Sequence, residues 1–366
     1  MNINIEYRHE SGFSTFFSRV NGKRVTVMYD INTKPFAKQI IKELATVAKE
    51  VAFVEYPDEE LVPTEDKCDQ AYEVAKNSDY VLAVGSGTLN DMAKSVSTRL
   101  NIECGVLVTA PSMDGYCSKG SALMRGGFKV TDEVHTPSDI LIDLEIVRNA
   151  PRLMIASGFG DILGKYTCLT DWKLANIING EPIHDEAFAL MEKARAECVG
   201  AFEDLTQYKA DAIAKLMNAL VTAGISMAIC GNSRPASGSE HHQSHFLEMD
   251  FVRRGEKIPL HGVKVAIGTL VSITLYNYLK DNQISFTGAE RVYKLVDELP
   301  SVETIQTMLE KMGCPVRFSQ IGVRKETMEE MLEKAYTVRD RFTVLTLIHN
   351  LGLTEKIKPI IMERFY

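Results

Sequence analysis

Residues 79–91 read DYVLAVGSGTLND, an apolar run over 79–84 followed at once by Gly-Ser-Gly at 85–87. The run is typical of a buried strand, and the glycines are typical of a tight turn into a helix, which we expect over about 90–100. Glycines let backbone N–H groups approach a ligand, and a helix N-terminus stabilises negative charge. The stretch predicts a strand–turn–helix unit that binds a pyrophosphate. Because the third glycine of the usual dinucleotide fingerprint is missing, a simple tight turn remains the alternative.

Similar strand and helix patterns surround this unit. The expected strands lie at 24–30, 51–54, 79–84, 105–108, 128–130 and 139–143, and the expected helices at 34–50, 64–78 and 90–100. Strands that alternate with helices of this length predict an α/β, Rossmann-like parallel sheet whose ligands bind at the carboxyl ends of the strands. Asp30 ends the first strand, where an acid accepts a hydrogen bond from a ribose hydroxyl; the alternative is a turn or helix-capping residue.

The second part of the chain has a different pattern. From Ile162 onward strand-like runs disappear and helical periodicity continues to the C-terminus. Glycine and proline breaks fall at 180–182, 231–235, 259, 300 and 313–315. We therefore predict two domains, an α/β domain at 1–150 and an all-helical domain at 151–366.

Composition excludes several classes of protein. The chain has 366 residues, 45% of them hydrophobic and 25% charged, as in soluble globular proteins. Its net charge of −8 argues against nucleic acid as a partner. We expect no membrane span, since no apolar run reaches about 18 residues, and the N-terminus has no apolar core of a signal peptide. Seven cysteines without a C-x-x-C pair favour free thiols and a cytoplasmic location.

Histidines gather between residues 234 and 262, which hold four of the eight in the chain. His241 and His245 are spaced i, i+4 and share one helix face, and His261 begins a new helical run after a Pro-Leu break. Neutral imidazoles that converge from two helices suit a borderline divalent metal. The alternative is a solvated polar helix end with scattered histidines.

A catalytic metal of this kind needs a further ligand, and the best candidate acid is Asp161 in ASGFGDILGKY, residues 156–166. We expect it at the start of the first helix of the second domain, at the domain junction, where clefts form. An Asp with two His leaves an open position for a substrate oxygen. The alternative is a helix N-cap.

Five motifs occur in order along the chain: GSGTLNDMAK, PSMDGYCS, SGFGDILGKYT, RPASGSEHHQSH and PLHGVKVAIG. Together they resemble the iron-containing alcohol dehydrogenase and glycerol dehydrogenase superfamily, and within it most closely the glycerol-1-phosphate dehydrogenases. The resemblance spans about residues 26 to 268, and the remaining helical tail carries little signature.

The resemblance implies a nucleotide-binding α/β domain, an all-helical metal domain and a dehydroquinate synthase-like fold. It implies NAD(H) or NADP(H) as cofactor and one divalent metal, Zn²⁺, Ni²⁺ or Fe²⁺, on Asp161, His241 and His261. Asp114 and His245 would contact substrate or relay a proton, whereas His242 faces away by spacing. The implied cofactor-binding residues are Asp30, Gly85, Ser86, Gly87, Asn90, Asp91, Thr109, Ser112 and Ser118.

One position departs from the resemblance. Four residues after Asp161 the alcohol dehydrogenases place a fourth metal-ligating His, whereas this chain has Lys165. A cation there suits a phosphorylated substrate, and Arg234 and Lys264 are further phosphate candidates, with an ordinary surface cation as the alternative for each. The expected reaction interconverts dihydroxyacetone phosphate and sn-glycerol 1-phosphate in a homodimer or higher homo-oligomer.

Three other readings stay open at this stage. The first is a glycerol dehydrogenase that acts on unphosphorylated substrates. The second is a cyclase similar to 3-dehydroquinate synthase, whose Glu metal ligand is not found in place of Asp161. The third is a nucleotide-binding module without turnover.

Overall fold

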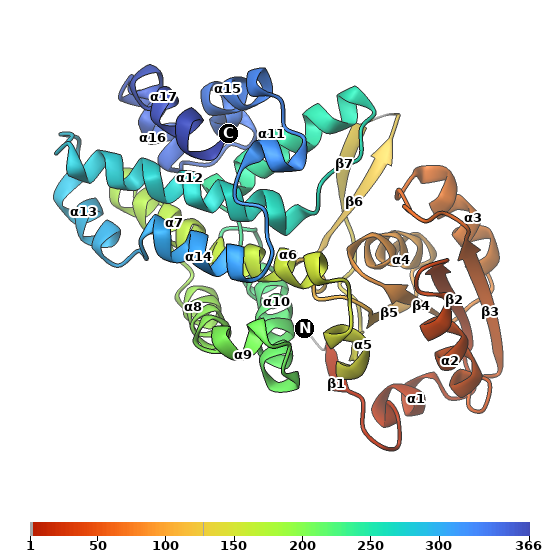
Figure 1. Cartoon of the computed structure of the whole chain (residues 1–366). Coiled ribbons are helices and arrows are strands. Elements are labelled where there is room, and N and C mark those ends of the chain that lie inside the picture. Colours follow the sequence, from red (N-terminus) through yellow and green to blue (C-terminus); the bar gives the residue numbers. More distant parts are fainter. Residues whose placement is uncertain (1–2, 127) are drawn as a thin grey trace. The chain divides into compact units, whose positions relative to one another are not determined.

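The structure is a computed structural model that describes residues 3–126 and 128–366. The chain divides into two compact units, one of residues 1–111 and 115–151 and the other of 112–114 and 152–366. Figure 1 follows the chain through both units, and each is described by itself below.

The first unit contains a six-stranded sheet in the order β1-β8-β5-β4-β2-β3, and each neighbouring pair is parallel. The strands are β1 (Asn4–Tyr7), β2 (Arg24–Asp30), β3 (Glu50–Tyr56), β4 (Tyr80–Gly85), β5 (Glu103–Val108) and β8 (Asp139–Ile142). The prediction of a parallel α/β sheet is confirmed. The chain crosses between most of these strands through helices, as parallel strands require.

Alternate side chains of the strands pack on opposite faces of this sheet. Val25, Val27 and Tyr29 of β2 join a core with α1 (Ser14–Val20) and α2 (Lys34–Leu44). On the opposite face α3 (Glu65–Ala75) packs against β2 and β3, and α4 (Gly87–Leu100) packs against β4 and β5. Both faces are covered, which explains why the strands are nearly continuous apolar runs.

Two details differ from the sequence expectations. The N-terminal segment forms an edge strand, β1, which pairs with β8; it was not predicted because its sequence, NIEY, lacks the apolar run by which the other short strands were recognised. The expected strand at 128–130 is part of β7 (Phe128–Glu133), which pairs antiparallel with β6 (Gly120–Arg125) in a separate two-stranded sheet. After β8 comes the short helix α5 (Leu144–Arg148).

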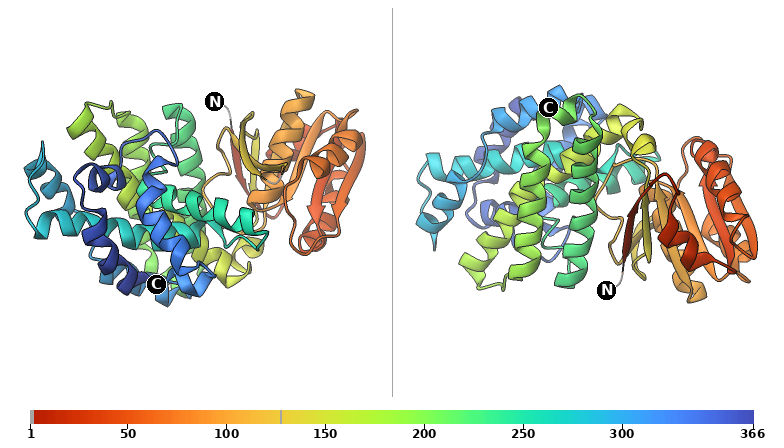
Figure 2. Two further views of the ribbon diagram at one scale, coloured as in Figure 1. Left: turned by 90° about the horizontal axis from the view of Figure 1, so that it is seen from above. Right: turned by 90° about the horizontal axis from the view of Figure 1, so that it is seen from below.

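The second unit is helical in its described residues. Its α-helices are α6 (Arg152–Leu163), α7 (Lys165–Asn179), α8 (Asp185–Gly200), α9 (Phe202–Thr206), α10 (Ala210–Cys230), α11 (Ser239–Arg254), α12 (His261–Asp281), α13 (Ala289–Asp297), α14 (Val302–Lys311), α15 (Lys325–Lys334), α16 (Val344–Asn350) and α17 (Thr354–Phe365). Helix α12 packs against α6 and α11, and α8 and α10 lie side by side in both views of Figure 2. The prediction of a helical second half is confirmed.

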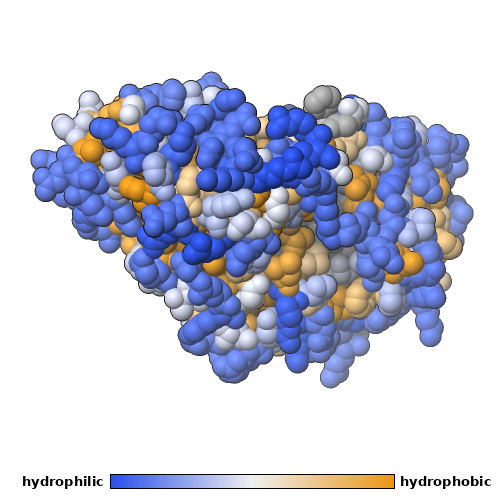
Figure 3. All heavy atoms as spheres, turned by 45° about the horizontal axis from the view of Figure 1, so that its top comes forward, coloured by the Kyte–Doolittle hydropathy of each residue, from blue (hydrophilic) through white to orange (hydrophobic). Residues whose placement is uncertain are grey.

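Two helices, α10 and α12, are long and apolar enough by length and composition to cross a membrane, with mean hydropathies of 1.6 and 1.2. This corrects the expectation that no stretch reaches that length. The core helices of soluble proteins meet the same test, and the apolar window of α12 is 89% buried within the chain, that of α10 50%. Most atoms on the face drawn in Figure 3 belong to hydrophilic residues, with hydrophobic residues in small groups between them.

Candidate metal centre

Three helices of the second unit bring Asp161, His241 and His261 together. One ligand atom from each lies within 4.8 Å of the others, and the two imidazole centroids are 5.1 Å apart. His241 is in the first turn of α11, and His261 is the first residue of α12, as the Pro-Leu break predicts. The expectation that Asp161 starts a helix is wrong, because α6 begins nine residues earlier, at Arg152, and Asp161 lies near its end.

Close packing of two helix backbones sets this geometry. A Cβ added to Gly262 would lie 1.9 Å from the carbonyl oxygen of Ser157, and one added to Gly160 would lie 2.7 Å from the carbonyl oxygen of Gly262. Only glycine permits so close an approach of α6 and α12. As a result, His261 at the start of α12 lies beside Asp161 near the end of α6.

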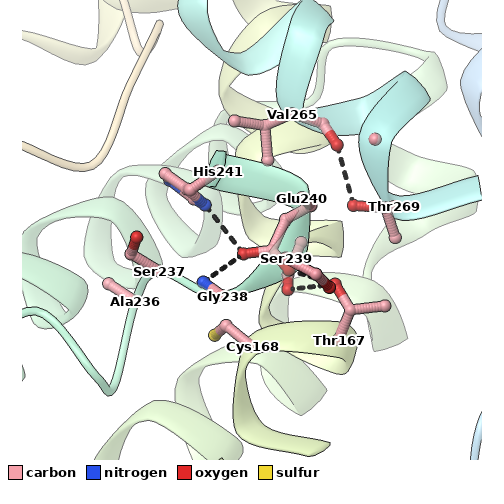
Figure 4. A network of polar contacts seen from close by, with 12 residues as sticks. Thr167, Cys168, Ala236, Ser237, Gly238, Ser239, Glu240, His241, Val265 and Thr269 are labelled. Atoms are coloured by element: carbon pink, nitrogen blue, oxygen red, sulfur yellow. Dashed lines mark hydrogen bonds and ion pairs between the residues drawn. The ribbon is translucent and has the colours of Figure 1, made fainter. Parts of the chain in front are cut away.

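Glu240 orients the first imidazole. Its Oε1 accepts from Nδ1 of His241 at 2.8 Å and from the backbone N–H of Gly238 at 2.6 Å, and its Oε2 accepts from the hydroxyl of Thr167 at 2.5 Å (Figure 4). With Nδ1 donating to Glu240, the lone pair of His241 is on Nε2, which lies 3.6 Å from Oδ1 of Asp161. Burial, and then the negative charge of Asp171, raise the pKa of Glu240.

Glu248 lies between the other two imidazoles. Its Oε1 is 3.2 Å from Nδ1 of His261, and its Oε2 is 3.3 Å from Nδ1 of His245. A carboxylate on Nδ1 leaves Nε2 of each ring as the acceptor, which is the common arrangement around protein-bound metals. Nε2 of His245 lies 3.4 Å from the guanidinium of Arg339, which has only donors, so this ring is occupied on both sides.

Two of the imidazoles have lowered pKa values, which favours the neutral form that metal binding requires. Burial lowers the pKa of His241 well below its ordinary value, with further contributions from Lys165 and the neighbouring histidines. Burial also lowers the pKa of His245 to about 4, against the opposing effect of Glu248.

Lys165 is fully buried beside Asp161. Its ammonium donates to Oδ2 of Asp114 at 2.6 Å, to Oδ1 of Asp161 at 2.9 Å and to the carbonyl oxygen of Ala236 at 2.9 Å. Burial alone lowers the pKa of Lys165, but Asp114 and Asp161 outweigh it, and the net pKa is raised. Burial and Asp161 raise the pKa of Asp114. All three ammonium protons have acceptors within the chain.

The other two predicted phosphate cations also have protein partners. Arg234 forms a two-pronged ion pair with Glu181 and donates to the carbonyl oxygen of Phe342 at 3.0 Å. Lys264 lies 3.2 Å from Oε1 of Glu248 and donates to the carbonyl oxygen of Pro259. Lys264 thus belongs to the support of the histidines, and it is buried rather than the surface cation of the alternative reading.

The predicted pyrophosphate turn lies in the first unit. Gly85 ends β4, Ser86 is at the N-cap position without a capping side-chain hydrogen bond, and Gly87 begins α4, so the turn joins the carboxyl end of a strand to a helix N-terminus. Thr109 follows β5 and its backbone N–H donates to the carbonyl oxygen of Gly85 at 3.0 Å. Asp30 accepts from the backbone N–H of Thr33 at 2.9 Å, which is the turn role that the sequence left open.

The remaining predicted cofactor residues form hydrogen bonds with backbone groups or side chains of other residues. Asn90 donates to the carbonyl oxygen of Tyr116, and Asp91 accepts from the backbone of Ala122. Ser118 donates to the carbonyl oxygen of Gly115 at 3.0 Å. In the second unit, the carbonyl oxygen of Ser112 accepts from the hydroxyl of Ser157 at 2.9 Å.

Several residues around these sites were not predicted. Buried Lys94 donates to carbonyl oxygens of Gly115 and Gly120 and pairs with Asp91. Glu240 directly precedes His241, and Glu248 follows His245 by three residues. This spacing could have indicated that a carboxylate orients each imidazole. Arg339 is 94 residues from His245 in the sequence and carries no such signal.

Residues 10–151 match the iron-containing alcohol dehydrogenase family. A glycerol-1-phosphate dehydrogenase [NAD(P)+] of Halalkalibacterium halodurans is 34% identical over 93% of this chain and 88% of its own length. The chain belongs to the glycerol-1-phosphate dehydrogenase family. A family member of the same name from Methanoregula boonei is 31% identical over 94% of this chain and 87% of its own.

Solved structures support the fold of the family. A glycerol dehydrogenase from Schizosaccharomyces pombe aligns with a TM-score of 0.72 over 99% of this chain and 91% of its own, at 16% identity. A probable glycerol dehydrogenase from Sinorhizobium meliloti aligns with a TM-score of 0.71 over 98% of each chain, also at 16% identity. The predicted fold class is confirmed, and the chain is an oxidoreductase of this family.

Proposed function

We propose that the protein interconverts dihydroxyacetone phosphate and sn-glycerol 1-phosphate, with NAD(H) or NADP(H) and one divalent metal. The observation that carries the proposal is the convergence of Asp161, His241 and His261 within 4.8 Å in a chain of this family. Its relatives from Halalkalibacterium halodurans and Methanoregula boonei are named for glycerol 1-phosphate and NAD(P)+.

The donor set fits a borderline metal. One carboxylate and two neutral imidazoles suit Zn²⁺, Ni²⁺ or Fe²⁺ and leave a coordination position for substrate. Glu240 and Glu248 hold Nδ1 of His241 and His261, so Nε2 of each ring is available. When bound, such a metal polarises a carbonyl oxygen as a Lewis acid, and a nicotinamide cofactor transfers the hydride.

Side chains around the metal site handle the proton and the charge. We assign the proton relay to Asp114, with His245 as the second candidate. Burial and the charge of Asp161 raise the pKa of Asp114, which makes this carboxylate a better proton acceptor than an exposed aspartate. Lys165 holds Asp114 and Asp161 in fixed orientations through its two ion pairs. These contacts support a positioning role for Lys165 more strongly than a phosphate contact.

The cofactor residues of the proposal follow the sequence prediction. The Gly85-Ser86-Gly87 turn offers backbone donors to a pyrophosphate. Asn90, Asp91, Thr109, Ser112 and Ser118 complete the proposed cofactor site, and Asp30 would disfavour the 2′-phosphate of NADP. We further propose a homo-oligomer in the cytoplasm, in keeping with seven free cysteines; size-exclusion chromatography and cell fractionation test these two points.

The test is NADH or NADPH oxidation by the purified protein reconstituted with Zn²⁺ or Ni²⁺, with dihydroxyacetone phosphate compared with dihydroxyacetone. We expect turnover with a strong preference for the phosphate, abolished by EDTA and restored by metal. A preference for the unphosphorylated ketone would reassign the protein to glycerol dehydrogenation. Cofactor binding without net oxidation would favour the cyclase or the binding module.

A further inference from the structure

Two arginines lie beside the histidine cluster, between the 3₁₀ turn at Ala335–Thr337 and helix α16. Arg339 is 3.4 Å from Nε2 of His245 and 3.3 Å from the hydroxyl of Ser233. Arg341 donates to that same hydroxyl at 3.0 Å and to the carbonyl oxygen of Ser237 at 2.6 Å. Two guanidinium groups therefore share one neutral oxygen.

Neither arginine forms a direct ion pair with a carboxylate in the described part of the chain; Glu248 and Glu181 act on Arg339 and Arg341 only through their charges. Within the described ranges 3–126 and 128–366, neither Arg339 nor Arg341 has a carboxylate oxygen within 4.0 Å, and Asp340 between them is exposed. Both arginines are half-buried, and burial lowers the pKa of each, that of Arg341 to about 10. Charges held away from water are normally paired, so this pair has the electrostatics of a site for an anion.

Unpaired polar atoms surround the same place. His242 is fully buried, and neither of its ring nitrogens has a hydrogen-bond partner. Nη1 of Arg234 and the hydroxyl of Ser237 are buried without partners as well. Burial lowers the pKa of His242, and after burial the positive charges of Arg341 and Arg339 contribute most to this lowering. Since buried polar groups nearly always have partners, these atoms indicate a missing ligand with several acceptor oxygens.

The sequence had assigned the phosphate to Lys165 and Arg234. The three protons of Lys165 are held by two carboxylates and a carbonyl oxygen, and the fork of Arg234 is held by Glu181. A phosphate at either residue would have to displace a carboxylate. At Arg339 and Arg341 it would displace only uncharged groups, which are the hydroxyl of Ser233, the carbonyl oxygen of Ser237 and Nε2 of His245. A guanidinium fork also matches phosphate geometry.

We propose that Arg339 and Arg341 form the subsite for the phosphate of a small phosphorylated ketone or polyol, and that buried His242 completes it. The contact of Arg339 with His245 places this subsite next to the metal ligands. The inference deepens the proposed function and rests on it for the identity of the carbon skeleton. The anion site itself rests on the contacts of the two arginines and on the unpartnered ring nitrogens of buried His242.

The first experiment compares Arg339→Met and Arg341→Met with the wild type and with Arg253→Met. Arg253 is a matched control, because it is an exposed arginine of α11 that pairs with Asp250. We expect KM for dihydroxyacetone phosphate to rise roughly tenfold to a hundredfold in each test variant, because each variant loses a hydrogen bond to a charged group. KM for dihydroxyacetone stays unchanged. The Arg339→Lys variant has a KM for dihydroxyacetone phosphate between those of the wild type and Arg339→Met. An unchanged KM for the phosphate in both test variants would overturn the subsite.

The second experiment uses the metal-loaded wild type and does not depend on the folding of any variant. Phenylglyoxal labels arginines, and peptide mass spectrometry measures the labelling of each with and without inorganic phosphate. We expect phosphate to protect Arg339 and Arg341 but not Arg253, and equal labelling with and without phosphate would overturn the proposal. If the wild type reduces neither ketone, the proposed function fails, and this labelling still decides whether the anion site exists.

Discussion

Two aspartates of the helical unit, Asp161 and Asp171, are both fully buried, yet their surroundings differ. Oδ1 of Asp171 accepts from the hydroxyl of Tyr276 at 2.6 Å and from the backbone N–H of Val344 at 2.8 Å. Its Oδ2 accepts from the backbone N–H of Ser239 at 2.6 Å. These neutral donors come from α12, α16 and the start of α11, so Asp171 joins three helices that are distant in the sequence.

Asp161 has one backbone donor, the N–H of Asp114, and one cation, Lys165. Its remaining neighbours are the imidazoles of His241 and His261, whose Nδ1 atoms are held by Glu240 and Glu248; this leaves Nε2 of each ring available to the proposed metal. Burial is therefore not what distinguishes a functional carboxylate from a structural one. The difference lies in the neighbouring groups. Hydrogen-bond donors surround the carboxylate of Asp171, whereas the carboxylate of Asp161 lies beside imidazole nitrogens that are themselves acceptors and could share a cation with it.

The strongest way to break this comparison is Asp161→Ala. We expect loss of bound metal and a fall in kcat/KM on the order of a thousandfold or more, because a ligand that acts as part of a unit is removed. Metal content by mass spectrometry and NADH oxidation measure both effects, with exposed Asp281→Ala of α12 as control. Full metal content in the Asp161 variant would exclude this residue as a ligand.

Asp171→Ala should act on stability instead. Two buried backbone N–H groups and the hydroxyl of Tyr276 lose their acceptor, each at roughly 1 kcal/mol or more, so the free energy of unfolding falls by about 3 kcal/mol. Urea denaturation measures the loss, and metal content per folded molecule should be unchanged. A variant with unaltered stability would show that Asp171 does not hold these helices together.

A smaller effect sharpens the comparison at Glu248. Glu248→Gln keeps the shape of the side chain but removes the carboxylate that supports His245 and His261. We expect metal affinity to fall about tenfold to a hundredfold, as for other outer carboxylates, with exposed Glu326→Gln as control. Competition with a chelating dye measures the affinity, and equal affinities in wild type and variant would contradict the support role.

Much of the fold was predictable because its signals are local. The expected strand at 24–30 has the bounds of β2, and the strand that begins at 79 and the helix that ends at 100 agree closely with β4 and α4. Edge strand β1 was missed because its sequence, NIEY, has no apolar run, unlike the equally short segments at 51–54 and 105–108. The expected strand at 128–130 was placed in the main sheet because β6, its actual antiparallel partner, had not been recognised in the sequence.

The sequence by itself determined the alternation of strand and helix, the helical second half, and the shared face of His241 and His245, because each follows from spacing along one element. Only the tertiary structure decided that Lys165 is saturated by two carboxylates and a carbonyl oxygen, and that Arg339 lies against His245. The physical reason is that the partners of a charged side chain decide whether it is available to a ligand. Those partners come from segments up to 94 residues apart, which helix packing alone brings together.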